Sequence, residues 1–182
     1  MPGPYYKALD ADGRSCNGGH SKWSLPVLQA DGTYKPGRWV PRIDNIEPCY
    51  RGYHLFERKD TFLWLNATLY EAEYRGAFID HGDKVVVESA RLVRPLPGYN
   101  DRTLRLFACR CAEDVLPIYE TQCPGDNRPR AAIEMARRYA DGKATAKELA
   151  AAWDAAWDAA WDTAGAAAGE KYLGWLWEML ES

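Results

Sequence analysis

A repeat close to the C-terminal end constrains the fold of this chain more than any other feature. Residues 150–162 read AAAWDAAWDAAWD, in which Ala-Ala-Trp-Asp occurs three times with a period of four residues. Alanine has the highest intrinsic helix propensity, and this spacing places successive tryptophans about one helical turn apart. The repeat therefore predicts a helix with an aromatic stripe that has to pack against something.

The drift of this stripe indicates how it can be covered. Each four-residue step advances a helix by about 400°, so successive tryptophans are displaced by about 40°. Coiled coils need apolar residues about every 3.5 positions, so this period argues against a long left-handed supercoil. Two interpretations stay open: a core helix covered by neighbouring helices, or an exposed recognition face. We expect Trp157 to be the most buried of the three, with Trp153 or Trp161 left for a partner.

Three aspartates form a second stripe on the same helix. Asp154, Asp158 and Asp162 lie about 100° around from the tryptophans. Carboxylates one turn apart resemble a ladder of metal ligands, but no histidine or second acidic helix accompanies them in the sequence. A solvated edge is the simpler interpretation, and from it Asp154 and Asp158 can contact a partner.

The residues around the repeat place the ends of its helix. Thr145-Ala-Lys-Glu148 fits a capping box, in which the threonine and glutamate side chains satisfy amides of the first turn. Gly165 and Gly169 each cost about 1 kcal/mol relative to alanine in a helix interior. We therefore expect a bend or break at 165–169, followed by a short final helix over Tyr172–Leu180.

Two earlier helices are expected in the same half of the chain. Asn100 or Asp101 can cap the first of them, and Pro117 forces a kink or a break near its middle. The second starts near Pro129, because a first turn tolerates a missing N–H. It stops at Asp141-Gly142.

The first half of the chain shows strand and turn signals instead. Pro26 weakens the second of the candidate strands, Asp31-Gly32 indicates a hairpin turn, and Asp60 can cap a short helix over Asp60–Leu65. The last candidate strand is rich in β-branched residues, which predicts a central position in the sheet. The candidate strands are Tyr5–Leu9, Ser21–Leu28, Leu69–Tyr74 and Lys84–Val93.

These signals predict an α+β fold in two parts. Pro95-Leu-Pro97-Gly98 is the best internal boundary, because it continues neither strand nor helix. Residues 1–97 are expected to form a β-rich domain, a mixed and mainly antiparallel sheet with a short helix. Residues 98–182 are expected to form a bundle of three to four helices, either a domain or an appendage packed on the first.

The distribution of charge argues against a nucleic-acid-binding protein. Residues 1–97 have a net charge of +1 and residues 98–182 of −4, so neither half attracts nucleic acid by bulk electrostatics. A basic cluster at Arg128, Arg130, Arg137 and Arg138 can contact phosphate or an acidic partner, or form a solvated helix face.

Targeting and metal signals are also missing from the sequence. The N-terminal residues MPGPYYKALDADG lack a basic start with an apolar run, so we expect no signal peptide, no membrane span and a cytoplasmic location in a bacterial host. The five cysteines contain no Cys-x-x-Cys pair, and three scattered histidines do not complete a ligand set. We expect reduced thiols, no metal and no cofactor.

An enzymatic alternative rests on polar residues of the first half. Short strands with an aromatic and an acidic residue are also found in small ADP-ribosyltransferase-like domains, an analogy at the level of the fold. Binding of NAD would test this alternative. The residues that might line its cleft are Tyr6, Ser15, His20, Tyr53, His54, Glu71 and Glu73.

Two segments of the second half carry a family resemblance. Cys111–Glu120 and Asp126–Glu134, followed by the Ala/Trp run, resemble a helical segment of bacterial and phage immunity proteins, with Arg128-Pro129-Arg130 the most specific phrase. The first half is similar to small uncharacterised phage and prophage domains through the phrases Tyr6-Lys7, Cys49…Gly52-Tyr53-His54 and Leu69–Glu73. The resemblance implies an accessory protein of a mobile element that acts by binding another protein.

The favoured hypothesis is therefore a non-enzymatic binding protein that blocks a host-defence or rival protein. Eight Trp and eleven Tyr against four Phe favour recognition, since these aromatics combine apolar area with a polar group. The residues assigned to partner binding are Trp153, Trp161, Asp154, Asp158, Arg128 and Arg130. A minor structural protein of the virion is a further alternative, and the sequence leaves the oligomeric state open.

Overall fold

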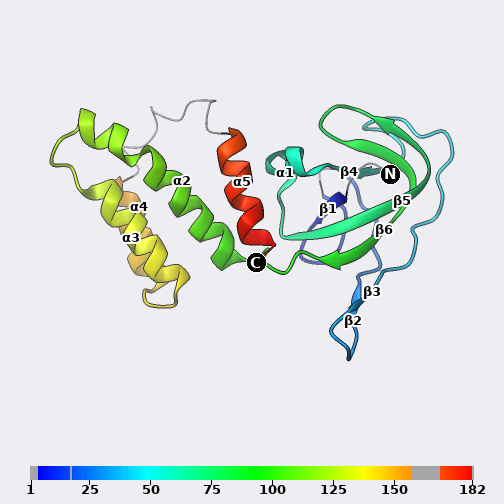
Figure 1. The fold of residues 1–182 in the computed structure, drawn as a ribbon, viewed down its shortest axis with the longest axis horizontal. Helices are drawn as coiled ribbons and strands as arrows, with labels where there is room; N and C mark the ends of the chain where they lie inside the picture. The colour runs from blue at the N-terminus through cyan, green and yellow to red at the C-terminus, as the bar shows by residue number, and fades with distance from the viewer. Residues whose placement is uncertain (1–3, 17, 157–168, 182) are drawn as a thin grey trace. The chain divides into compact units, whose positions relative to one another are not determined.

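The computed structural model describes residues 4–16, 18–156 and 169–181. The chain divides into two compact units, Met1–Pro97 and Gly98–Ser182. The first holds an antiparallel sheet with a short helix and the second holds helices (Figure 1). The predicted α+β fold class is confirmed.

A curled four-stranded sheet forms the centre of the first unit. Its strands are antiparallel in the order β1 (Tyr5–Leu9), β5 (Thr68–Asp80), β6 (Val85–Pro95) and β4 (Tyr53–Leu55). The two edges meet beyond β4, where the amides of Tyr6 and Phe56 each donate to the other residue's carbonyl, at 2.8 and 3.0 Å. This closure satisfies backbone groups that a sheet edge leaves unpaired and gives the sheet an inside and an outside.

The inside of the curl holds the hydrophobic core. Strand β6 is buried along most of its length and lies between β5 and β4, so its predicted central position is confirmed. A loop runs beside the rest of β6, with the amides of Gly37, Val40 and Ile43 donating to β6 carbonyls at 2.9 Å. Gly37 is required there, because a Cβ would lie 1.9 Å from the Ser24 carbonyl oxygen.

The predicted hairpin turn at Asp31-Gly32 is confirmed. It joins β2 (Val27–Leu28) to β3 (Tyr34–Lys35) in a two-stranded sheet of its own, which extends away from the curled sheet in Figure 1. The prediction of a strand over Ser21–Leu28 is wrong for residues 21–26. Trp23 leaves the strand direction to enter the core, its amide donating to the Gly13 carbonyl, and Pro26 has no N–H to donate.

The short helix predicted over Asp60–Leu65 is present as α1 (Thr61–Trp64), but Asp60 does not cap it. A single 3₁₀ turn, η1 (Arg58–Asp60), precedes α1 and holds Asp60 at φ −98° and ψ 5°. A capping side chain needs an extended backbone at that position to reach the first free amides. The Thr61 hydroxyl donates instead to the Arg58 carbonyl, at 2.7 Å.

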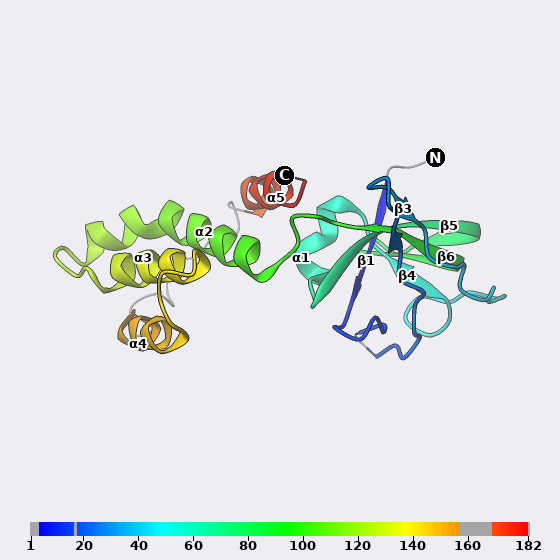
Figure 2. The same cartoon turned by 90° about the horizontal axis from the view of Figure 1, so that it is seen from below.

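The second unit consists of the helices α2 (Asp101–Gln122), α3 (Arg128–Ala140), α4 (Ala146–Ala156) and α5 (Gly169–Leu180). In Figure 2, α3 lies between α2 and α4. Asn100 caps α2 by accepting a hydrogen bond from the Thr103 amide at 3.0 Å, as one of the two predicted caps. Helix α2 continues through Pro117, so a break there is excluded. The predicted limits of α3, at Pro129 and at Asp141-Gly142, are confirmed to within one residue.

Helix α4 contains the start of the Ala-Ala-Trp-Asp repeat, and its capping box is confirmed. The Thr145 amide donates to a Glu148 carboxylate oxygen at 2.7 Å, and the Glu148 amide donates to the Thr145 hydroxyl at 3.3 Å. The predicted bend at 165–169 and the expectation for Trp157 fall outside the described residues.

Candidate functional site

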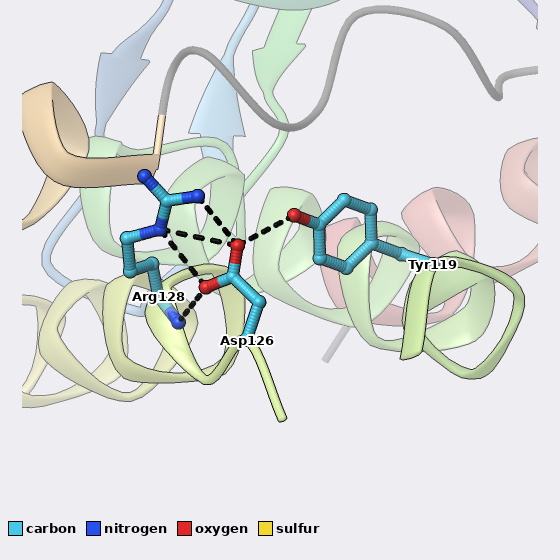
Figure 3. A network of polar contacts seen from close by, with 3 residues as sticks. All are labelled: Tyr119, Asp126 and Arg128. Atoms are coloured by element: carbon cyan, nitrogen blue, oxygen red, sulfur yellow. Dashed lines mark hydrogen bonds and ion pairs between the residues drawn. The ribbon is translucent and has the colours of Figure 1, made fainter. Parts of the chain in front are cut away.

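A carboxylate in the connection between α2 and α3 joins the two helices (Figure 3). Asp126 accepts hydrogen bonds from the Tyr119 hydroxyl at 2.7 Å, from the Arg128 amide at 3.0 Å and from the Arg128 guanidinium at 2.6–3.1 Å. Arg128 begins α3 and Tyr119 lies in the last turns of α2. One side chain therefore fixes the end of one helix against the start of the next.

The electrostatics of this cluster follow from its hydrogen bonds. The Arg128 guanidinium, the Tyr119 hydroxyl and the Arg128 amide hold the pKa of Asp126 far below its ordinary range. Conversely, donation to Asp126 raises the pKa of Tyr119 to about 12. At neutral pH the cluster is therefore a charged pair with a neutral phenol.

Further ion pairs hold the helical unit together. Arg130 bonds Glu120 and Arg137 bonds Glu113, each with two guanidinium nitrogens. Seven of the unit's ten Lys and Arg side chains pair with its own carboxylates: Arg102, Arg110, Arg128, Arg130, Arg137, Lys143 and Lys171. Three of the four arginines of the basic cluster are thus paired within the unit, and the fourth, Arg138, donates to the Lys143 carbonyl at 3.3 Å.

Helix α5 is attached to α2 by a comparable set of contacts. Asp114 accepts from Lys171 at 2.5 Å and from the Tyr172 hydroxyl at 3.1 Å. The Arg110 guanidinium lies over the Trp175 ring, 4.0 Å from its centroid, an arrangement in which the ring face attracts the cation.

Small side chains leave a largely apolar hollow of about 290 Å³ between α2 and α3. Ala108 and Ala112 on α2 face Ala132 and Ala136 on α3, and Leu104, Cys109 and Ile133 complete its apolar lining. Arg105 lies near one side, with its guanidinium 4.8 Å from the Tyr139 ring centroid.

The residues assigned to partner binding fall into two groups. Arg128 and Arg130 are exposed on α3 and each is paired with a carboxylate. Trp153 and Asp154 lie in α4, but their side chains, and all of Asp158 and Trp161, fall outside the described residues. Their role in binding a partner stays a prediction.

The first unit contains a second hollow, which also has a volume of about 290 Å³ and has polar and apolar groups in its lining in about equal parts. It lies beside β1 and β4. Polar side chains that line it include Lys7 of β1, His54 of β4 and Lys84 before β6, and a loop contributes Ser15, Cys16, Gly18, Gly19 and Ser21.

Lys7 is the most unusual residue of this cavity. It lies between Tyr5 and Leu9 on β1, two residues of the core face, and it is 9% exposed. Its ammonium donates to the His54 carbonyl at 3.0 Å and lies 5.5 Å from the centroid of the Trp23 ring. Burial lowers the pKa of Lys7 to about 8.

His54 is held neutral in the same cavity. Its Nε2 accepts a hydrogen bond from the Cys49 amide at 3.1 Å, so the ring proton is on Nδ1. Cys49 has a φ of 68°, an uncommon conformation for a residue with a side chain. Burial, followed by the charges of Lys7 and Lys84, lowers the pKa of His54 to about 4. The residue is therefore not a base that titrates near neutral pH.

The structure brings together only part of the set named for the enzymatic alternative. Ser15, Tyr53 and His54 line the cavity. Tyr6, His20, Glu71 and Glu73 are described but are not among its lining residues. Glu71 and Glu73 form ion pairs across the sheet with Arg94 and Arg91 of β6.

Sequence reasoning missed Lys7 and Lys84 as candidate site residues. A signal for Lys7 was present, because period-two alternation places it on the same face of the strand as Tyr5 and Leu9. A lysine at a position that alternation assigns to a core is a candidate functional residue. No sequence pattern of this kind identifies Lys84. It precedes β6 and lines the cavity only because the folded sheet brings β6 beside β4.

The described residues show neither a metal-binding cluster nor a helix that could span a membrane. They contain no group of three or more His, Cys, Asp or Glu side chains arranged to hold a metal ion. Within the same ranges, none of the helices combines the length and the apolar character needed to cross a bilayer.

Comparison with known families gives one match, to the helical unit. Residues 98–170 match the family described as Imm-5 like putative immunity protein. The match starts at the first residue of this unit, ends at the start of α5 and covers less than half of the chain. No curated protein and no solved structure matches the chain. The resemblance of the second half to immunity proteins is confirmed to this extent, and the match does not extend to residues 1–97.

Proposed function

We propose that this chain is an immunity-type accessory protein of a phage or mobile element, which binds a host-defence or rival protein and blocks it. The observation that carries the proposal is the family match over residues 98–170. Immunity proteins act by binding, and the Tyr119–Asp126–Arg128 cluster of this unit has a structural part, since it holds the end of α2 against the start of α3.

The charge of the helical unit supports a partner with a basic surface. The unit has a net charge of −4, and seven of its cations are already paired within it. The field that such a unit projects is negative, which steers a basic protein toward it and repels an acidic one.

The partner-binding face that we propose includes α4 and the start of α3. It combines Trp153 and Trp161 as aromatic anchors with Asp154 and Asp158 as the acidic edge, in keeping with the aromatic enrichment of binding hot spots. We assign Arg128 and Arg130 to the border of this face; each has a carboxylate partner of its own that fixes its orientation.

Affinity purification of the tagged full chain from host lysate tests the proposal. We expect one protein to copurify at a stoichiometric ratio, and Asp154→Lys to reduce its recovery. Asp44→Lys, a charge reversal at an exposed position of the first unit, serves as the matched control and should leave recovery unchanged. The absence of a stoichiometric protein, or equal loss with both variants, would count against the proposal.

A further inference from the structure

The cavity beside β1 and β4 has an unbalanced charge. Lys7 and Lys84 both line it, and among the described lining residues none carries a carboxylate. Lys84 forms an ion pair with Asp83, in which the Lys84 Nζ and the Asp83 Oδ1 are 3.9 Å apart. Both lysine side chains are largely buried, with Lys84 13% exposed. Lys84 therefore has one carboxylate partner at the limit of ion-pair distance, and the contacts of Lys7 are a carbonyl oxygen and an aromatic ring. Burying a cation is unfavourable unless an anion accompanies it, so this cavity is suited to an anion from outside the chain.

The polar groups around the lysines favour a phosphate as that anion. Ser15 Oγ accepts a hydrogen bond from the Trp23 indole N–H at 2.9 Å, which leaves its own hydroxyl proton free to donate. Ser21 contributes a second hydroxyl, and Gly18 and Gly19 also line the cavity. Lysines, hydroxyls and glycine backbone together are the groups with which proteins hold phosphate.

The size and the rim of the cavity limit the rest of the ligand. Its volume of about 290 Å³ lies at the lower end of the roughly 300–1,000 Å³ usual for small-molecule sites. Tyr50 lines it and is 84% exposed, so its ring is available to stack on a planar group. Tyr53 and Trp23 are buried and form part of the wall.

We propose that this cavity is a binding site for a small phosphorylated ligand of mononucleotide size, whose phosphate lies against Lys7 and Lys84. Ser15 and Ser21 donate hydrogen bonds to the same phosphate, and Tyr50 stacks on the ring of the ligand. The site is separate from the protein-binding function proposed for the helical unit, since every residue that forms it belongs to Met1–Pro97.

Isothermal titration calorimetry of the full chain with adenosine 5′-monophosphate, ribose 5-phosphate and adenosine tests this site. We expect saturable binding of adenosine 5′-monophosphate, weaker binding of ribose 5-phosphate, and no binding of adenosine. Lys7→Met and Lys84→Met should each weaken the binding of adenosine 5′-monophosphate by about tenfold or more, the loss of one charge-assisted contact. Near-UV circular dichroism of the variants establishes that they are folded.

Lys35→Met is the matched control, because Lys35 is an exposed lysine of β3 that does not line the cavity. Its affinity for adenosine 5′-monophosphate should equal that of the unmodified chain. Adenosine that binds as well as its monophosphate, no saturable binding at millimolar ligand, or full affinity in folded Lys7→Met and Lys84→Met would each overturn the proposal.

Discussion

A lysine on the inner face of a curled sheet lowers the stability that the rest of the core provides. Lys7 is 9% exposed, and its partners in the structure are a carbonyl oxygen and an aromatic ring. Neither neutralises its charge as a carboxylate would. At the residue scale, the protonation of Lys7 at this position should therefore make a measurable contribution to the free energy of unfolding.

The sign of the pH dependence follows from the direction of the shift. Burial lowers the pKa of folded Lys7 to about 8 from an ordinary value of 10.5, against a smaller opposing effect of Cys16. Between these two values the unfolded chain binds more protons than the folded one, so the Lys7 contribution to stability rises with pH. Below about pH 8 both states hold the proton, and the full cost of burying the charge is present.

Lys7→Met should therefore stabilise the protein at pH 7, by on the order of 2 kcal/mol. The advantage of the variant should shrink as the pH rises above 8, because the lysine of the unmodified chain then loses its charge on folding. Urea unfolding of both proteins between pH 7 and pH 10 measures this difference. A variant less stable than the unmodified chain at pH 7, or a difference that does not change with pH, would contradict the account.

At the element scale, the irregularity in β5 is a second testable feature. Gly76 has a φ of 85° at a point where the pairing of β5 with β6 shifts register. A Cβ there would lie 2.0 Å from a Glu88 carboxylate oxygen, and Glu88 is buried between Arg42 and the Ala77 amide. The carboxylate thus occupies the space that a side chain at position 76 would need.

Gly76→Ala and Gly82→Ala form a matched pair for this feature. Both glycines have the same backbone conformation, with φ of 85° and 84°, but a Cβ at Gly82 meets nothing within 4 Å. Each substitution should lower the free energy of unfolding by about 1–2 kcal/mol, because alanine is strained in the left-handed backbone conformation. Gly76→Ala should lower it further, because the new Cβ displaces Glu88. Thermal unfolding compares the two, and equal destabilisation would show that the close approach to Glu88 does not matter.

The start of α2 allows a similar comparison. The Asn100 side chain accepts from the Thr103 amide, whereas Asn127, at the same position of α3, makes no capping hydrogen bond. Asn100→Ala should lower the free energy of unfolding by about 1 kcal/mol, and Asn127→Ala should change it much less. Denaturant unfolding measures both, and a larger effect at Asn127 would contradict the assignment of the caps.

Local signals in the sequence predicted elements well and contacts poorly. The Thr145–Glu148 capping box, the Asp31-Gly32 turn and the limits of α3 depend on neighbours within a few residues. The joining of Tyr6 to Phe56 and the loop beside β6 depend on residues far apart in the chain. For the same reason the cavity beside β1 and β4 was only partly predicted, through Ser15, Tyr53 and His54.

At the scale of the whole molecule, the chain combines a sheet unit and a helical unit, and we propose a different binding function for each. The helical unit matches an immunity-protein family and carries the acidic charge. The sheet unit has a cationic cavity to which we assign a phosphorylated ligand. If the two activities are independent, Lys7→Met should weaken ligand binding and leave protein binding intact.

The central claim is that the chain binds a protein and thereby blocks it. The most direct measurement is the activity of the copurified partner, titrated with the purified full chain. The account predicts that activity falls in proportion to added chain and reaches its minimum at a stoichiometric ratio, while Asp154→Lys needs a clear excess. A partner that keeps its full activity when saturated with the chain would contradict the claim.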